Sequence, residues 1–112
     1  MKISMMLTQE TFSSSTEKIN VIIKNNTLDQ YYTGMKYSIE YFNGTTWDKV
    51  PLDITVNYVI VLLHPKESKE LSVYLYPEQY HYKAGKYRIC KNVYLTEDMK
   101  DAYELTSEFN IK

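Results

Sequence analysis

The stretch YSIEYFNGTTWDKVP (residues 37–51) decides the fold, because it reads as two β-strands joined by a tight turn. In its first half, Tyr37, Ile39 and Tyr41 alternate with a second set of side chains that would face the other way. A period of two is typical of a β-strand with one face buried. Asn43-Gly44 follows, and both residues tolerate the positive φ angles that a two-residue hairpin requires. The stretch therefore predicts an antiparallel hairpin.

The same period of two recurs along the rest of the chain, and turn-forming clusters of Ser, Asn, Pro and Gly separate the runs. About seven short strands in one chain favour an all-β fold, an antiparallel immunoglobulin-like β-sandwich of two sheets. Only residues 77–82 are expected to form a helical turn. The residues predicted to point inward are Ile19, Val21, Ile23, Ile39, Leu71, Val73, Tyr87, Ile89 and Phe109.

The composition limits the classes of partner. The chain has 112 residues, which predicts a single domain over residues 1–112. A net charge of -1 removes the simplest electrostatic reason to expect nucleic acid as a partner. The longest apolar run, residues 59–63, is too short to span a bilayer, so no membrane insertion is expected. No signal-peptide core is visible, so either the protein is cytoplasmic or a signal has been removed.

Four segments in order resemble the bacterial immunoglobulin-like domains of secreted and cell-envelope proteins. They are TFSSSTEKINVIIKNNT (11–27), YSIEYFNGTTWDKVPL (37–52), LHPKESKELSVYL (63–75) and AGKYRICKNV (84–93). Ala84 stands where proline is commoner in that family. The resemblance implies an accessory or adhesive module that is secreted or displayed on the cell surface. It carries over no catalytic residues and no cofactor.

Tyr87 and Ile89 are the structural residues that the resemblance identifies. In immunoglobulin domains the sixth strand carries a Tyr two positions before the bridging Cys, and the Tyr hydroxyl bonds back to an upstream backbone group. Tyr87 matches that Tyr, and Ile89 takes the place of the Cys. A tyrosine corner is thus expected, with the Tyr87 hydroxyl bonded to backbone in residues 77–84.

Cys90, the only cysteine, falls one position beyond the usual bridging site. A catalytic thiolate needs a neighbouring base and an oxyanion-stabilising turn, and neither accompanies Cys90 in the sequence. We expect a thiol packed at the surface of a sheet. Arg88 and Lys91 could lower its pKa, which leaves reactivity without catalysis open.

Other motifs give weak signals. His64 and His81 lie 17 positions apart without paired ligands, so no metal site is predicted. The acidic segment 96–101 lacks the spacing of a calcium loop. Asn25 and Asn43 begin N-x-[ST] sequons, which in a bacterial chain would carry no glycan.

Aromatic residues supply the ligand-binding candidates. Exposed tyrosine clusters on a sandwich can bind protein partners or stack on sugars, although such rings can equally just cover sheet edges. Trp47 is also expected to cap one end of the core, with Tyr37 or Ile39 in the place of the usual core tryptophan. The candidate ligand-binding residues are Tyr74, Tyr76, Tyr94, Tyr31, Asn43 and Trp47.

Two functions remain in competition. The first is a non-catalytic immunoglobulin-like module, a spacer or a unit for protein or carbohydrate recognition. The second is a small protease inhibitor of the same fold, because NGTTW (43–47) faintly resembles an Asn-Pro-Thr-Thr-Gly inhibitory loop. No constellation supports an enzyme.

Overall fold

The computed structural model describes residues 2–112. This part of the chain contains ten β-strands, joined by turns and loops, and no helix. The strands exceed the predicted seven because β2, β4, β6 and β7 have only two or three residues, too few to show a period. Residues 77–80 form a turn, as expected. The strands are β1 (Lys2–Leu7), β2 (Thr11–Phe12), β3 (Lys18–Asn26), β4 (Tyr31–Thr33), β5 (Ser38–Phe42), β6 (Trp47–Lys49), β7 (Val61–Leu63), β8 (Ser68–Tyr74), β9 (Gly85–Tyr94) and β10 (Ala102–Ile111).

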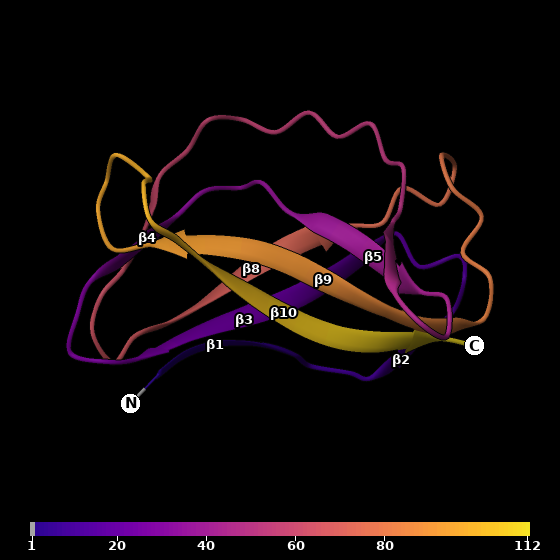
Figure 1. Cartoon of the computed structure of the whole chain (residues 1–112), viewed down its shortest axis with the longest axis horizontal. Helices are drawn as coiled ribbons and strands as arrows, with labels where there is room; N and C mark the ends of the chain where they lie inside the picture. The colour runs from indigo at the N-terminus through magenta and orange to yellow at the C-terminus, as the bar shows by residue number, and fades with distance from the viewer. Residues whose placement is uncertain (1) are drawn as a thin grey trace.

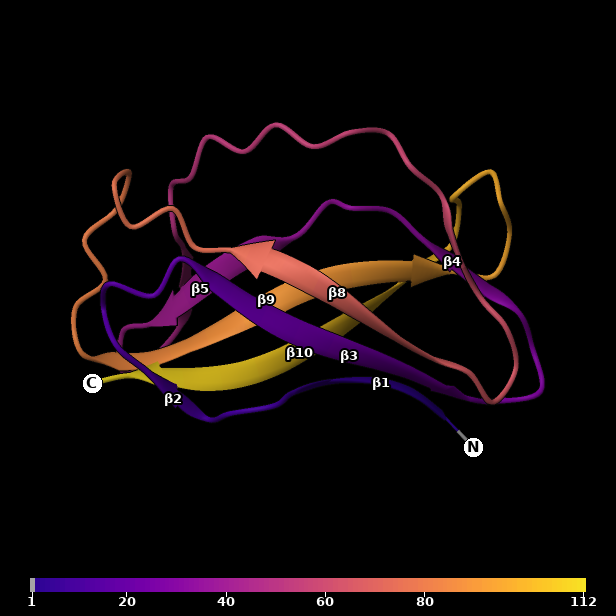
Figure 2. The same cartoon turned by 180° about the vertical axis from the view of Figure 1, so that it is seen from behind.

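The strands form two sheets that face each other, which confirms the predicted β-sandwich (Figure 1). The first sheet has the order β1-β3-β8, and Figure 2 shows it in front of β9 and β10. The second has the order β2-β10-β9-β4-β7, and β5 also pairs with β9 and with β6. Every pairing is antiparallel except β2 with β10, which is parallel and departs from the prediction.

The core lies between the sheets and consists of the inward set of each strand. Ile39 and Tyr37 are both buried there, as expected for the place of the missing tryptophan. All the predicted inward residues are buried except Leu71, which is half-buried because β8 is the edge strand of its sheet. Four buried aromatic residues fill the centre: Tyr37, Tyr82, Tyr87 and Phe109. Tyr87 stacks on Phe109, with 5.6 Å between the ring centroids.

The strand β9 organises the second sheet. Its first half pairs with β5, from Tyr87 to Cys90, and its last two residues pair with β4. Residues 34–37, which connect β4 to β5, therefore bulge away from β9 between the two pairings. The bulge lies opposite Lys91 and Asn92, and its backbone oxygens accept hydrogen bonds from the Lys91 side chain.

A second irregular segment connects β6 to β7. In both views, residues 51–60 pass over one long side of the molecule, and residues 34–37 run beneath them (Figures 1 and 2). We call residues 51–60 the arch. The sequence analysis assigned no element to residues 51–60. Their apolar residues have a strand-like composition, which does not reveal that the segment is an unpaired arch.

The tyrosine corner yields a first prediction. The Tyr87 hydroxyl donates to the backbone oxygen of Lys83 at 2.8 Å, in the connection that the sequence indicated. Replacing Tyr87 with Phe removes this bond and leaves the ring, so the free energy of unfolding should fall by about 1 kcal/mol. Urea denaturation of both proteins measures the difference. Identical midpoints would show that the bond contributes nothing.

Candidate ligand-binding site

The arch is anchored at one end and exposed in the middle. Val50 is buried, and Leu52 and Ile54 pack against the core. The backbone of Asp53 both receives a hydrogen bond from and donates one to the Gln79 side chain. Beyond Ile54 the apolar side chains face solvent, and Tyr58 is 85% exposed.

A hollow of about 400 Å³ lies on one side of the arch. Its walls come from the bulge, the middle of the arch, the last half of β9 and the loop that follows β9. The lining combines aromatic and apolar side chains with three lysines and one acid. The lining residues are Gly34, Met35, Lys36, Tyr37, Ser38, Lys49, Val56, Asn57, Tyr58, Val59, Cys90, Lys91, Asn92, Tyr94, Met99 and Glu104.

A second hollow of about 220 Å³ adjoins the first, since Tyr37 and the arch residues Val56 and Val59 line both. Tyr74 and Tyr76 form its far wall, with their ring centroids 6.3 Å apart. The Tyr37 hydroxyl donates to the backbone oxygen of Tyr74 at 2.7 Å and accepts from the Tyr74 backbone N–H at 3.2 Å. Burial raises the pKa of Tyr37 to about 12, so the hydroxyl keeps its proton.

The tyrosines predicted to bind a ligand fall into three places. Tyr74 and Tyr76 line the second hollow, and Tyr94 lines the first. Tyr31 lies outside both hollows, half-buried against the core, with its ring centroid 6.2 Å from that of Tyr103. The structure thus groups three of the tyrosines around the arch and separates Tyr31 from them.

Asn43 and Trp47 lie at the β5–β6 hairpin, apart from both hollows. The Asn43 side-chain oxygen accepts from the backbone N–H groups of Thr45 and Thr46, which fixes the turn. Trp47 does not cap the core as expected. Its ring packs at a tilt against Phe42, with 5.1 Å between the centroids, and the Arg88 guanidinium lies over the Trp47 ring at 4.3 Å. Because Phe42 points outward in the strand alternation, its cross-strand neighbour Trp47 lies on the outer face of the sheet.

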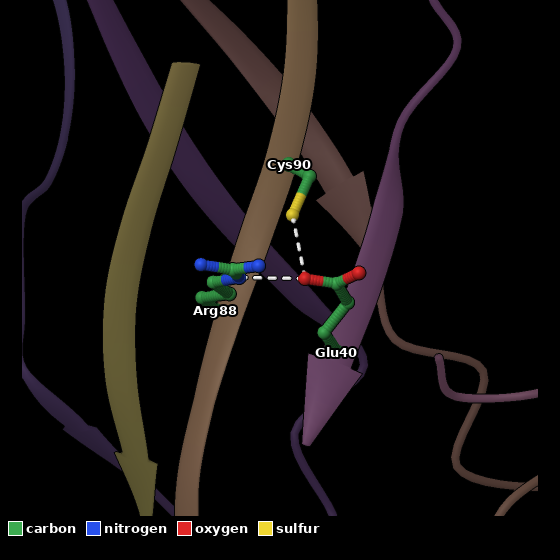
Figure 3. A network of polar contacts seen from close by, with 3 residues as sticks. All are labelled: Glu40, Arg88 and Cys90. Atoms are coloured by element: carbon green, nitrogen blue, oxygen red, sulfur yellow. Dashed lines mark hydrogen bonds and ion pairs between the residues drawn. The ribbon is translucent and has the colours of Figure 1, made fainter. Parts of the chain in front are cut away.

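Cys90 is a buried thiol, only 5% exposed. Its Sγ lies 3.4 Å from Glu40 Oε1, which also accepts a 2.6 Å ion-paired hydrogen bond from Arg88 Nε (Figure 3). Burial, together with the Glu40 hydrogen bond and charge, raises the pKa of Cys90 to about 11. The Arg88 charge does lower this pKa, as expected, but burial and Glu40 outweigh it, so the thiol is not activated. A thiol in this state is a poor nucleophile.

Lys91 is a functional candidate that the sequence analysis missed. Its side chain is 4% exposed, and its Nζ donates to the backbone oxygens of Gly34 and Lys36 in the bulge, at 2.5 and 3.0 Å. The ammonium takes the place of a strand partner for these carbonyls. Burial lowers the pKa of Lys91 to about 8. Strand alternation could have indicated this burial. Lys91 lies two residues from both Ile89 and Val93, so it shares their inward face.

Lys91 predicts an unusual dependence of stability on pH. The unfolded chain holds this proton up to the ordinary pKa of 10.5, whereas the folded protein begins to release it near pH 8. Above pH 8 the unfolded state binds the Lys91 proton more tightly, so Lys91 should add about 1 kcal/mol to the free energy of unfolding between pH 8 and pH 9. The raised pKa of Cys90, from 9.0 to about 11, acts in the opposite direction and offsets roughly a third of this gain over the same range, whereas the raised pKa of Tyr37 acts only closer to pH 10. Urea denaturation at both pH values, with Lys91→Met as the control, tests the rise. A flat or falling profile for the wild type contradicts it.

The histidines are exposed on separate loops, at His64 and His81. Within residues 2–112, no three His, Cys, Asp or Glu side chains are grouped so that they could hold a metal ion. Nor does this part of the chain contain a helix long and apolar enough to cross a membrane.

The comparison with protein families gives a match over nearly the whole chain. The model of a family described as "Bacterial Ig-like domain" matches residues 1–110. Among curated proteins, none matches this chain significantly.

Solved structures with similar folds come from proteins with very different sequences. The periplasmic chaperone SfaE superposes with a TM-score of 0.56 at 8% identity, over 98% of this chain and 57% of the chaperone. The β-glucosidase EmGH1 of Erythrobacter marinus gives 0.46 at 12% identity, over 100% of this chain and 15% of the enzyme. A Listeria innocua β-glucosidase in complex with gluconolactone gives 0.43 at 14%, over 98% and 16%. The chain therefore spans only part of each of these proteins, and the chaperone match supports the immunoglobulin-like fold alone.

Proposed function

Since this chain belongs to the family of bacterial Ig-like domains, we propose that it is a non-catalytic recognition module of a secreted or surface protein. Its partner is a protein or a carbohydrate, and the contact surface is the arch with its two hollows. One observation carries the proposal: an exposed apolar segment lies between two hollows lined by tyrosines. Exposed aromatic residues beside concave surfaces are typical of binding sites, and a spacer would not need them.

The absence of catalysis is part of the proposal and rests on two features. The family resemblance supplies no catalytic residues, and the only thiol is buried with a raised pKa. Hydrogen bonding by Tyr94, Asn57 and Asn92 and stacking by exposed rings are sufficient for recognition. Because Tyr58 is almost fully exposed, its ring can contact a partner without any rearrangement of the core.

The test is a binding screen against a glycan panel and a peptide library, followed by mutation. Tyr58→Ala and the double variant Tyr74→Ala, Tyr76→Ala should each weaken binding of any hit about tenfold or more, the loss typical of an aromatic hot spot. Tyr103→Ala is the matched control, because Tyr103 is exposed but lines neither hollow. A hit that is unaffected by the arch variants, or a complete absence of hits, contradicts the proposal and leaves a spacer.

The protease inhibitor is a second candidate, favoured by the fixed turn at Asn43. Besides the two backbone bonds, the Asn43 side-chain nitrogen donates to Thr46 Oγ1 and to Asp48 Oδ2, both at 3.0 Å. A turn held in this way loses little conformational freedom on binding, as an inhibitory loop requires. Inhibition of a protease that is lost on Asn43→Ala, but kept in the Tyr58→Ala variant, would put this candidate first.

A further inference from the structure

We infer that the first hollow binds the carboxylate of an acidic sugar residue and that Lys91 is the residue that pairs with it. The inference rests on the proposed recognition function and adds the chemical class of the ligand. It depends on the position of one buried cation, on the other charges of the hollow and on the kind of side chains around them.

Lys91 is a buried cation without a counter-charge. Its ammonium has three N–H donors, and the backbone oxygens of Gly34 and Lys36 accept two of them. Among residues 2–112, no carboxylate forms an ion pair with it. Burying a charge is costly unless a partner of opposite charge is present, and backbone carbonyls supply a dipole but no negative charge. A ligand anion in the hollow would complete the pairing through the third donor.

The other charges of the hollow favour an anion as well. Lys36 and Lys49 line it together with Lys91, whereas Glu104 is its only acid. The lysines come from the bulge, from β6 and from β9, so three separate elements contribute positive charge to one concave surface. Such a concentration of one sign attracts ligands of the opposite sign.

The neutral part of the lining fits a sugar. Tyr58 and Tyr94 offer ring faces, while Asn57, Asn92 and Ser38 offer amide and hydroxyl groups. Ring faces pack against the C–H groups of a sugar, and amides can both donate to and accept from its hydroxyls. The lining contains no arginine, the residue best suited to a bidentate contact with phosphate. The one N–H of Lys91 that remains beside its two backbone bonds suits one oxygen of a carboxylate.

The experiment compares charged and uncharged forms of one ligand. Trisaccharides of galacturonic and glucuronic acid, and a sialylated trisaccharide, are titrated calorimetrically into the wild type, each beside its methyl ester. At least one acid should bind about tenfold or more tightly than its ester, because a hydrogen bond to a charged group is lost in the ester. This comparison needs no variant. A short peptide rich in Asp and Glu is titrated in parallel.

Two lysine variants place the effect. Lys91→Met replaces the ammonium with an unbranched apolar side chain one atom shorter and should remove the preference for the acid over the ester. Lys36→Met, at an exposed position, should weaken acid binding severalfold and covers the case in which Lys91→Met does not fold. Lys24→Met is the matched control, because Lys24 is an exposed lysine of β3 that does not line the hollow. It should leave both affinities unchanged.

Three results would overturn the inference: no acid binds, acid and ester bind equally, or only the acidic peptide binds. These failures differ from a failure of the proposed function. If neutral glycans or peptides bind and Tyr58→Ala weakens them, recognition by the arch stands while the acidic subsite falls. If binding of an acid survives both Lys91→Met and Lys36→Met, the carboxylate lies elsewhere and the subsite is wrong.

Discussion

Replacing Asn25 with alanine should lower the free energy of unfolding by about 3 kcal/mol. Asn25 is fully buried at the end of β3, where it joins two connections that lie far apart in the sequence. Its side-chain nitrogen donates to the backbone oxygens of Asp29, Leu63 and His64. Its side-chain oxygen accepts from the backbone N–H and the hydroxyl of Thr27. Alanine leaves the Thr27 N–H without its acceptor and the Leu63 oxygen without its side-chain donor, and a buried polar group that loses a partner carries a desolvation penalty. The Asp29 oxygen keeps a bond from Thr27 Oγ1, and the His64 oxygen keeps one from the Glu67 N–H.

The size of this effect follows from the number of groups that the amide satisfies at once. The matched control is Asn26→Ala, at the next position, where the side chain is exposed and accepts one long hydrogen bond from Lys66. That change should stay within about 0.5 kcal/mol of the wild type. Chemical denaturation of the three proteins at neutral pH gives both values. Equal losses for the two variants would show that the buried network does not stabilise the fold.

Replacing Gly85 with alanine should cost about 2 kcal/mol, for two reasons that add. Gly85 begins β9 with a φ of +153°, which L residues rarely adopt. A Cβ at this position would also lie 3.0 Å from Cε1 of Tyr41. The Tyr41 ring cannot move away freely, because it packs against Tyr87 at 5.0 Å and lies under the Lys83 ammonium at 4.6 Å.

Gly44 separates the two causes. It has a φ of +101°, but a Cβ there would meet no atom within 4 Å. Gly44→Ala therefore carries backbone strain alone and should cost less than Gly85→Ala. Thermal or urea unfolding of both variants measures the difference, to which the contact with Tyr41 contributes. If Gly44→Ala were the more damaging of the two, the contact with the ring would have no role.

Much of the sandwich was predictable because strand periodicity and turn chemistry are local properties. Ile19, Val21 and Ile23 point inward in one strand, and their alternation is visible without knowing which strand pairs with them. The tyrosine corner was predictable from the resemblance around Tyr87. Local patterns gave no information about β4 and β7, which have three residues each and become strands through pairing with distant segments, β4 with β7 and β9, and β7 with β4.

The candidate site was predictable in part. Tyr74 and Tyr76 were singled out from the alternation in LSVYLYP (71–77), and they do share one hollow, although β8 ends at Tyr74. The arch was not predicted. Val56, Val59 and Ile60 have a strand-like composition, and composition does not show that this segment has no strand partner in the structure. Lys91 was missed because the local sequence does not reveal the bulge at residues 34–37, whose backbone oxygens accept hydrogen bonds from the Lys91 ammonium. Both depend on contacts between distant segments.

The contact between Tyr37 and β8 also affects the open edge of the first sheet, where another molecule could pair and start aggregation. β8 is the outermost strand of its sheet, and strands in that position tend to recruit matching segments from other molecules. The Tyr37 hydroxyl occupies the N–H and the oxygen of Tyr74, the pair with which an incoming strand would register at that end. A phenylalanine at position 37 would keep the ring and uncover that pair. Tyr37 thus lines the second hollow and at the same time blocks one hydrogen-bonding position on the open edge of the sheet.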